Sequence, residues 1–253
     1  MKISFTKNQS IGFASVLSIL AAWKLLALYF NSSFIVPHPE DTFITVMKLI
    51  GSSGFLKVVG TTVLRGVTGF VISAVIGIGT GILAGVSPGF NAFINPIMVT
   101  VRSTPVISLI LLALIWFSSG MVPIFIAMLT MFPFICTNVV DGIRSVDQNL
   151  IEMAGFYQVG RRKIISGVYI PAIMPFIISG ASSAMGIGWR AIIIGEVLSQ
   201  PRYGIGTSMQ SAQIFLNVDV VIAWTLIAVL ISYVFEKLIR WGERKIVIWK
   251  KQL

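Results

Sequence analysis

The chain places charged side chains inside apolar stretches, where an ionisable group is expected either to contact a solute or to pair with another residue. Arg102 precedes Pro105, Arg190 follows Trp189, and Glu196 comes six positions later. Such residues are costly at bilayer depth, which makes them candidates for a solute pathway or gate. The competing interpretation is structural, with the arginines donating to backbone carbonyls freed nearby. Because residues six apart lie on different helix faces, we expect Arg190 and Glu196 to meet different neighbours.

Enzyme chemistry has little support elsewhere in the sequence. His38 is the only histidine, and Cys136 is the only cysteine. A catalytic site needs a nucleophile beside a base, or a set of metal ligands, and these two distant residues supply neither. We therefore expect a non-catalytic protein without a cofactor.

The composition is typical of an integral membrane protein. Of 253 residues, 56% are hydrophobic and only 11% are charged, and the mean hydropathy is +0.92. Soluble domains carry about a quarter charged residues. The net charge of +10 does not indicate nucleic acid, because the basic residues lie between apolar runs without aromatic stacking platforms.

The apolar segments predict an all-α membrane protein with one transmembrane domain over residues 1–253. Stretches of sufficient length predict six spans, at 11–30, 59–84, 96–117, 121–140, 172–198 and 219–240. The first is interpreted as a retained helix, because it is too long for a signal peptide. With the N-terminus inside, the outer segments hold only Lys48, Lys57 and Arg202. The positive-inside rule then places both termini and the loop between spans four and five in the cytoplasm.

Small residues recur every fourth position in two of these spans. The second span carries Gly69, Ser73, Gly77, Gly81 and Gly85, and the fifth carries Gly180, Ala184 and Gly188. Each stripe lets another helix backbone approach closely. The two stripes predict a tightly packed bundle and are compatible with a dimer.

The loop at 141–175 interrupts the apolar sequence with a basic, amphipathic segment. A short helix is expected to begin near Gln148 with Asp147 as its cap. A second amphipathic turn should follow Gly160, starting with the basic run at 161–163. An apolar helix face in the cytosol needs a groove in its own chain, in the lipid interface or in a partner, and the residues alone leave all three open.

This loop resembles the EAA loop of ABC-importer permeases. Glu152, Met153 and Ala154 stand at the triplet, and Ile170–Pro171 stand at the closing aliphatic-proline pair. The resemblance makes Glu152 a docking contact or an internal brace, against the alternative of a solvated carboxylate.

The loop departs from the family pattern at its turn. Gln158 occupies the expected glycine position, just after Tyr157, and Gly160 follows two residues later. A nearby glycine can supply a bend, so Gly160 is expected to replace the missing one.

The resemblance extends from about Thr61 to Tyr233. The segments TTVLRGVTGFVISAVIGIGTGILAG, NPIMVTVRSTPVISLILLALIWFSSG and GIGWRAIIIGEVLSQPRYGIG are similar to the nitrate/sulfonate/taurine-type branch of these permeases. It implies a type I ABC-importer permease fold with a cytoplasmic coupling loop at about 141–171.

The same resemblance implies the setting in which the chain works. Two copies would form the pore in a cell inner or plasma membrane. Two cytoplasmic ATPase subunits would receive the coupling loops, and an extracytoplasmic binding protein would deliver the solute. The expected solute is a small anion such as an aliphatic sulfonate, taurine, nitrate or bicarbonate, or else a thiamine or pyrimidine precursor. The chain has no G-x-x-x-x-G-K-[ST] phosphate loop, so the ATPase must be a partner.

An ion-gradient-driven secondary transporter is the alternative. Such carriers show internal repeats or buried carboxylates that bind the coupling ion. Only Glu196 qualifies, and no repeat is visible.

Overall fold

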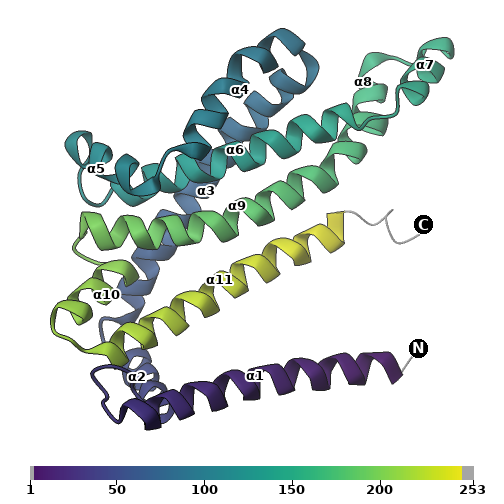
Figure 1. The fold of residues 1–253 in the computed structure, drawn as a ribbon. Helices are drawn as coiled ribbons and strands as arrows, with labels where there is room; N and C mark the ends of the chain where they lie inside the picture. Colours follow the sequence, from purple (N-terminus) through teal and green to yellow (C-terminus); the bar gives the residue numbers. More distant parts are fainter. Residues whose placement is uncertain (1–2, 247–253) are drawn as a thin grey trace.

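The computed structural model describes residues 3–246, and all regular elements in this range are helical (Figure 1). Their order is α1 (Ile3–Phe30), α2 (Pro39–Ile50), α3 (Phe55–Val86), α4 (Pro88–Ser103), α5 (Val106–Trp116), α6 (Val122–Arg144), α7 (Gln148–Phe156), α8 (Arg161–Ile164), the π-helical turn η1 (Ile165–Tyr169), α9 (Ile170–Ser199), α10 (Ile205–Ile214) and α11 (Val218–Ile246). The predicted all-α fold is confirmed.

Several helices are long and apolar enough to cross a membrane. They cover Phe55–Val86, Val122–Arg144, Arg161–Ser199 and Val218–Gly242, and so match the predicted second, fourth, fifth and sixth spans. The predicted first span corresponds to α1, whose apolar part, Ala14–Phe30, is shorter.

The predicted third span is not one straight helix. Instead, α4 and α5 meet at an angle of 99°. Pro105 is the cause, since proline disfavours helical geometry in the residue before it. Thr104 accordingly has φ −73° and ψ 130°, an extended conformation. Counting the bent pair as a single span brings the number of candidate spans to five.

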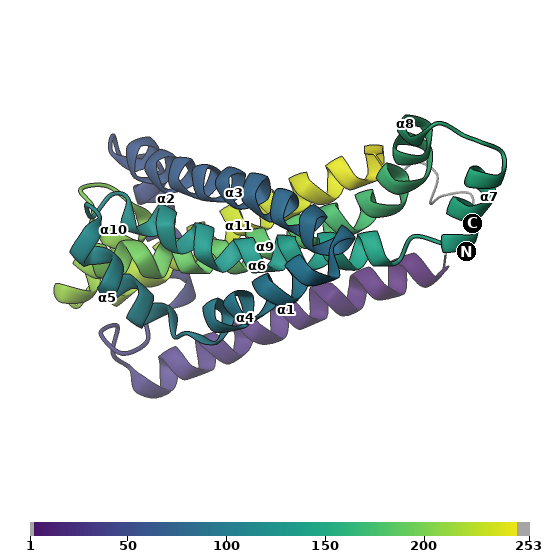
Figure 2. The ribbon, with the colours of Figure 1, turned by 90° about the horizontal axis from the view of Figure 1, so that it is seen from above.

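Helix α6 lies at the centre of the bundle and packs along both α3 and α9 (Figures 1 and 2). The two small-residue stripes make this packing possible. A Cβ atom on Gly81 would lie 2.7 Å from Cβ of Val139, and one on Gly180 would lie 2.7 Å from Cβ of Asn138. Both stripes therefore face α6 of the same chain, so they serve packing within one copy and leave no stripe exposed for a dimer.

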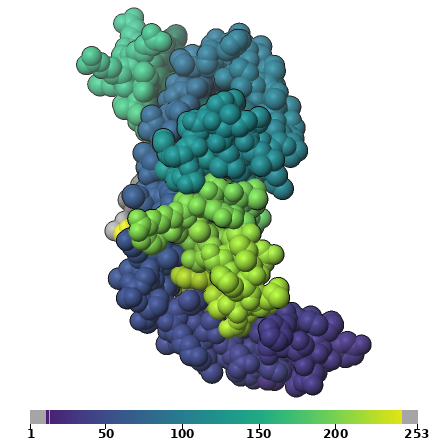
Figure 3. Space-filling view, turned by 90° about the vertical axis from the view of Figure 1, so that its left-hand side faces the viewer, coloured from purple at the N-terminus to yellow at the C-terminus, as the bar shows by residue number. Residues whose placement is uncertain are grey.

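The ends of the bundle differ in character. Figures 1 and 2 place α7, α8 and the first and last described residues at one end, and α2, α5 and α10 at the other. Figure 3 looks onto the second end. There the segments coloured blue (around residue 50), green (around residue 200) and teal (around residue 115) lie one after another along a curved surface. Helix α10 packs here against α9 and α11.

Candidate functional site

The predicted coupling loop (residues 141–171, for which the name coupling loop is kept below) contains a short helix with a defined start. Helix α7 begins at Gln148, and the side chain of Asp147 accepts a hydrogen bond from the backbone N–H of Asn149 at 2.9 Å. Both the predicted start and the predicted cap are confirmed. A cap of this kind satisfies an N–H group that the first turn leaves without a helical partner.

The turn after α7 is made by Gln158 and not by Gly160. Gln158 has φ 54°, in the left-handed region, whereas Gly160 has φ −58°. The N–H of Val159 donates to the carbonyl of Ala154 at 2.9 Å, and that of Gln158 donates to the carbonyl of Gly155 at 2.9 Å. These paired bonds are the Schellman arrangement, in which the residue after the helix end is left-handed. The expectation that Gly160 supplies the bend is therefore wrong, because helix termination requires the bend directly after Tyr157.

Helix α7 leaves its apolar side chains uncovered. Leu150 and Met153 are about half exposed, while Phe156 and Tyr157 are 87% and 73% exposed. Glu152 is also exposed. These exposed apolar side chains, on a nine-residue helix and its C-cap residue Tyr157, form a candidate contact surface for a partner.

The second part of the coupling loop runs directly into the bundle. Helix α8, η1 and α9 form one continuous helix from Arg161 to Ser199. Ile170 and Pro171 lie in its interior, and the π-helical turn Ile165–Tyr169 stands immediately before them. Pro171 has no N–H to donate and its ring crowds the preceding turn, so a widened turn at this place lets the helix continue.

A second site lies at the far end of α9, around Glu196. Its carboxylate is fully buried, and Oε1 accepts hydrogen bonds from Nη1 of Arg65 at 2.6 Å and from the hydroxyl of Thr62 at 2.9 Å. Oε2 accepts from the backbone N–H of Gly206 at 2.9 Å. The hydroxyl of Thr62 accepts in turn from the N–H of Ile205 at 2.9 Å. We call these groups the Glu196 cluster.

The Glu196 cluster joins three helices. Thr62 and Arg65 belong to α3, Glu196 belongs to α9, and both N–H groups open α10. Arg190 and Glu196 do meet different neighbours, as expected. Sequence reasoning missed Arg65 as a partner, although its spacing of three from Thr62 places both side chains on one face of α3.

Trp189 and Arg190 have different surroundings although they are adjacent. Trp189 is buried and its indole Nε1 donates to the carbonyl of Ala228 in α11 at 3.0 Å. Arg190 is exposed and lines a groove of about 480 Å³ between α9 and α11, which also carries the hydroxyls of Thr225 and Ser232.

The basic residues that interrupt the apolar spans divide into two kinds. Lys24 pairs with Glu40 at 2.8 Å, and Arg65 pairs with Glu196. In the described part of the chain, the side chains of Arg102 and Arg190 make no ion pair or hydrogen bond. Arg102 and Pro105 lie at the α4–α5 bend, outside the groove that contains Arg190. The structure does not bring the two arginines into one site.

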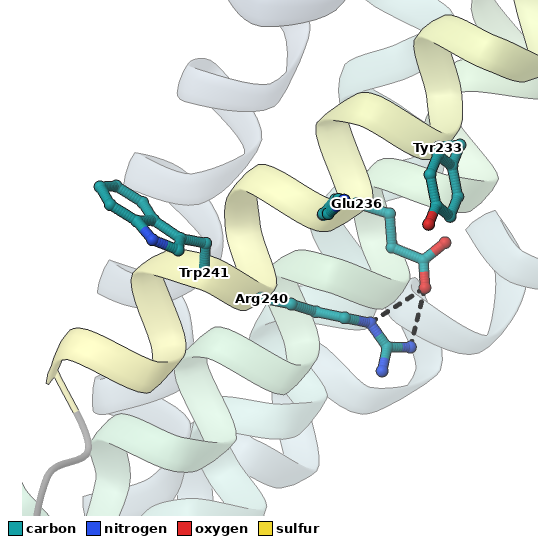
Figure 4. A pocket seen from close by; sticks show the side chains of 5 residues that line it. Tyr233, Glu236, Arg240 and Trp241 are labelled. Carbon is teal, nitrogen blue, oxygen red and sulfur yellow. Dashed lines mark hydrogen bonds and ion pairs between the residues drawn. The ribbon is translucent and has the colours of Figure 1, made fainter. Parts of the chain in front are cut away.

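A further groove lies on the C-terminal part of α11, on the side of α7 and α8 (Figure 1), and is drawn in Figure 4. It has a volume of about 360 Å³ and is lined by Tyr233, Glu236, Lys237, Arg240 and Trp241. Figure 4 shows the carboxylate of Glu236 turned towards the guanidinium of Arg240, at 2.8 Å. Glu236 also lines the Arg190 groove, and its exposed pair with Arg240, one helical turn away, neutralises its carboxylate.

Within residues 3–246, no group of three or more His, Cys, Asp and Glu residues is placed to hold a metal ion. Cys136 is buried in α6. His38 precedes α2, and its buried Nδ1 has no hydrogen-bond partner.

The long apolar helices, the bent α4–α5 pair and the short α7 helix at one end define the class as an all-helical membrane protein. A solved inward-facing structure of the MetNI methionine ABC transporter has the same fold, with a TM-score of 0.63 at 19% identity over 76% of this chain and 94% of that chain.

Sequence comparison gives the family. Residues 77–248 match the model described as the inner-membrane component of binding-protein-dependent transport systems. A putative ABC transporter permease of Methanocaldococcus jannaschii is 30% identical over 91% of this chain and 88% of its own length. The taurine transport system permease protein of Escherichia coli is 27% identical (95% and 89%), and a putative aliphatic sulfonates transport permease of Bacillus subtilis is 28% identical (92% and 84%). The chain belongs to this family and is a permease component of an ABC importer.

Proposed function

We propose that this permease moves a small anionic solute into the cell with energy from a separate ATPase that docks on α7 and α8. The exposed apolar surface of α7 carries the proposal, because a short amphipathic helix in water is stabilised when a partner groove covers it. Phe156 and Tyr157 are the most exposed side chains of that surface and are of the type that dominates binding at protein interfaces.

The continuous helix from Arg161 to Ser199 supports a mechanical role for the docking site. When two ATPase subunits close on ATP, they would push the coupling loops of two permease copies together. Because α8 continues into α9, the displacement would enter the bundle as a rigid-body motion of packed helices. Glu152, exposed on α7, would contact the ATPase.

The assembly we propose contains two copies of this chain, two ATPase subunits and an extracytoplasmic binding protein. Both termini and the coupling loop would lie in the cytoplasm. This orientation is supported by the shared end of α7, α8 and the first and last described residues (Figure 2). It also puts Arg144 and the basic run at 161–163 on the inner side, as the positive-inside rule requires.

The solute class follows from charge and from the relatives. Two of the relatives are named for taurine and aliphatic sulfonates, which both carry a sulfonate group. Arg190 would meet such an anion in the groove between α9 and α11, because it makes no ion pair in the described chain, and the one carboxylate that lines the groove, Glu236, is paired with Arg240. Trp189 would line the same groove, whereas Arg102 and Pro105, at the α4–α5 bend, would belong to another part of the pathway.

Uptake by proteoliposomes tests the proposal. Vesicles containing the permease and its ATPase, with ATP inside and the binding protein outside, should accumulate labelled taurine or ethanesulfonate. Omitting ATP or the binding protein should abolish accumulation. Uptake by the permease alone on a proton or sodium gradient would instead identify a secondary transporter and contradict the proposal.

A further inference from the structure

The loop at residues 200–204 joins α9 to α10. Its inner side, towards the bundle, is held by hydrogen bonds, and Arg202 on its outer side is exposed. On the inner side, Nη1 of Arg65 donates to the backbone carbonyl of Tyr203 at 2.7 Å as well as to Glu196. On the outer side, Nζ of Lys57 lies 4.2 Å from the centre of the Tyr203 ring, and Cζ of Arg202 lies 5.3 Å from it. A hydrogen bond from the Lys57 amine lowers the pKa of Tyr203 from its ordinary value. The loop thus offers a basic and aromatic surface directly over the Glu196 cluster.

The loop cannot shift independently of the Glu196 carboxylate. A Cβ atom on Gly204 would lie 2.6 Å from the carboxyl carbon of Glu196, and one on Gly206 would lie 2.7 Å from its Cβ. Only glycine fits at such a distance. The loop and the start of α10 therefore rest directly on the carboxylate, so a displacement of the loop must move Glu196 or break its hydrogen bonds.

Glu196 lies close to the outer end of the helix whose inner end is α8. That helix runs without a break from Arg161 to Ser199, and at 1.5 Å per residue its 39 residues extend for about 58 Å. The exposed loop at one end and the coupling loop at the other are therefore joined by one continuous element, with the Glu196 cluster as the outer joint.

We propose that the Glu196 cluster acts as a relay. When the binding protein contacts residues 200–204, the cluster transmits the displacement of this loop to α3 and α9, and so to the end of the bundle that faces the ATPase. The inference rests on the proposed function, and it assigns Arg65 and Glu196 a positioning role. Lys57 of α3 and Arg202 of the loop give this surface a positive charge, which fits an acidic patch on the docking face of the binding protein.

This role differs from solute or ion binding at Glu196. Both carboxylate oxygens already accept hydrogen bonds, from Arg65, Thr62 and the N–H of Gly206. The carboxylate is fully buried and its charge is neutralised by Arg65. A cation or an anion entering the pathway would find no free acceptor or net charge there.

The variant Glu196→Gln breaks the cluster with little change in volume. An amide replaces one oxygen by an NH2 donor, while Oε1 faces the guanidinium of Arg65 and Oε2 faces the N–H of Gly206, which can only donate. Either orientation of the amide therefore loses bonds. Arg65→Lys is the conservative partner, because a single nitrogen of Arg65 makes both of its bonds. Glu40→Gln is the matched control, since it removes the carboxylate of an exposed pair with Lys24.

Two measurements test the relay. In the purified permease without partners, trypsin should cleave after Arg202 about tenfold faster in Glu196→Gln than in the wild type, because local opening then costs less. In the complex with the ATPase, Glu196→Gln should keep basal ATP hydrolysis and lose most of the stimulation by taurine-loaded binding protein. Arg65→Lys should retain part of the stimulation, and Glu40→Gln should retain all of it.

The possible results separate the relay from the proposed function. A wild-type complex that no binding protein stimulates would overturn the proposed function itself. Full stimulation in Glu196→Gln, alongside a stimulated wild type, would overturn the relay alone. A loss of basal and stimulated hydrolysis in equal proportion would also overturn the relay, because it would show that the cluster only maintains the fold.

Discussion

The guanidinium of Arg65 and the carboxylate of Glu196 meet at 2.6 Å although 131 positions separate them in the chain. Removing one member of a buried ion pair leaves the other charge without a partner, which costs about 3–5 kcal/mol. Arg65→Met should therefore lower the free energy of unfolding by that amount. The double variant Arg65→Met/Glu196→Leu should recover part of the loss, because an apolar pair carries no unpaired charge. Thermal unfolding of the purified proteins in detergent measures both, and a double variant less stable than Arg65→Met would contradict this account.

Replacing Gln158 by glycine should stabilise the coupling loop. Its φ of 54° costs an L-residue about 1–2 kcal/mol, and glycine avoids the cost. Gln158→Gly should slow amide hydrogen exchange at Val159 and Gln158, the donors of the Schellman bonds. Gly160→Ala, at a φ of −58°, is the control and should leave exchange unchanged. Faster exchange in Gln158→Gly would show that the side chain itself supports the turn.

Phe156→Ser should weaken binding of the ATPase subunit. Truncating an exposed aromatic that becomes buried at an interface costs about 2 kcal/mol, or roughly a thirtyfold change in Kd. Phe43 in α2 is 66% exposed and lies at the opposite end (Figure 1), so Phe43→Ser is a matched control. Titration of the detergent-solubilised permease with ATPase gives both constants. Equal weakening by the two variants would place the docking site elsewhere.

A methyl group on the α3 stripe should separate α3 from α6. At Gly81 the added Cβ would lie 2.7 Å from Val139, while at Gly79 on the same helix it would meet nothing within 4 Å. Gly81→Ala should thus cost about 1–3 kcal/mol of stability through overpacking. Gly79→Ala should be neutral or slightly stabilising, since alanine favours helix more than glycine. Thermal unfolding compares them, and equal midpoints would contradict the packing argument.

Arg190→Gln should slow uptake of a sulfonate without weakening ATPase binding. The loss of one favourable charge contact, worth about 1.4 kcal/mol, corresponds to a tenfold slower transport step. Lys24→Gln, which alters an already paired cation on α1, should have little effect on the uptake rate. Initial rates of labelled taurine uptake in proteoliposomes make the comparison. An unchanged rate in Arg190→Gln would remove Arg190 from the solute pathway.

Local sequence patterns predicted the elements whose structure depends on local physics. Asp147 predicted the start of α7 correctly, because a capping side chain bonds to backbone groups in the first turn of its own helix. The periodic small residues of α3 predicted close helix packing, because periodicity places them on one face. The family resemblance supplied the fold class, which the matched family model confirms.

The missed features depend on contacts between distant segments. The partner of Glu196 was not evident, because nothing near residue 196 reveals which helix will pack against it. Helix α10 was not predicted, because its sequence, IGTSMQSAQI, is too short and polar for a membrane span. Its start is fixed by the N–H groups of Ile205 and Gly206, which donate to Thr62 and Glu196. The break at Pro105 was treated as part of one span, because apolar length alone does not distinguish a straight helix from a bent pair.

The uninterrupted helix from Arg161 to Ser199 acts as a lever with both arms in one polypeptide. If it pivots about its middle, its ends move in opposite directions, and over a length of about 58 Å a tilt of about 5° carries each end through roughly 2.5 Å. Such a pivot would narrow one mouth of the pathway in the same stroke that widens the other.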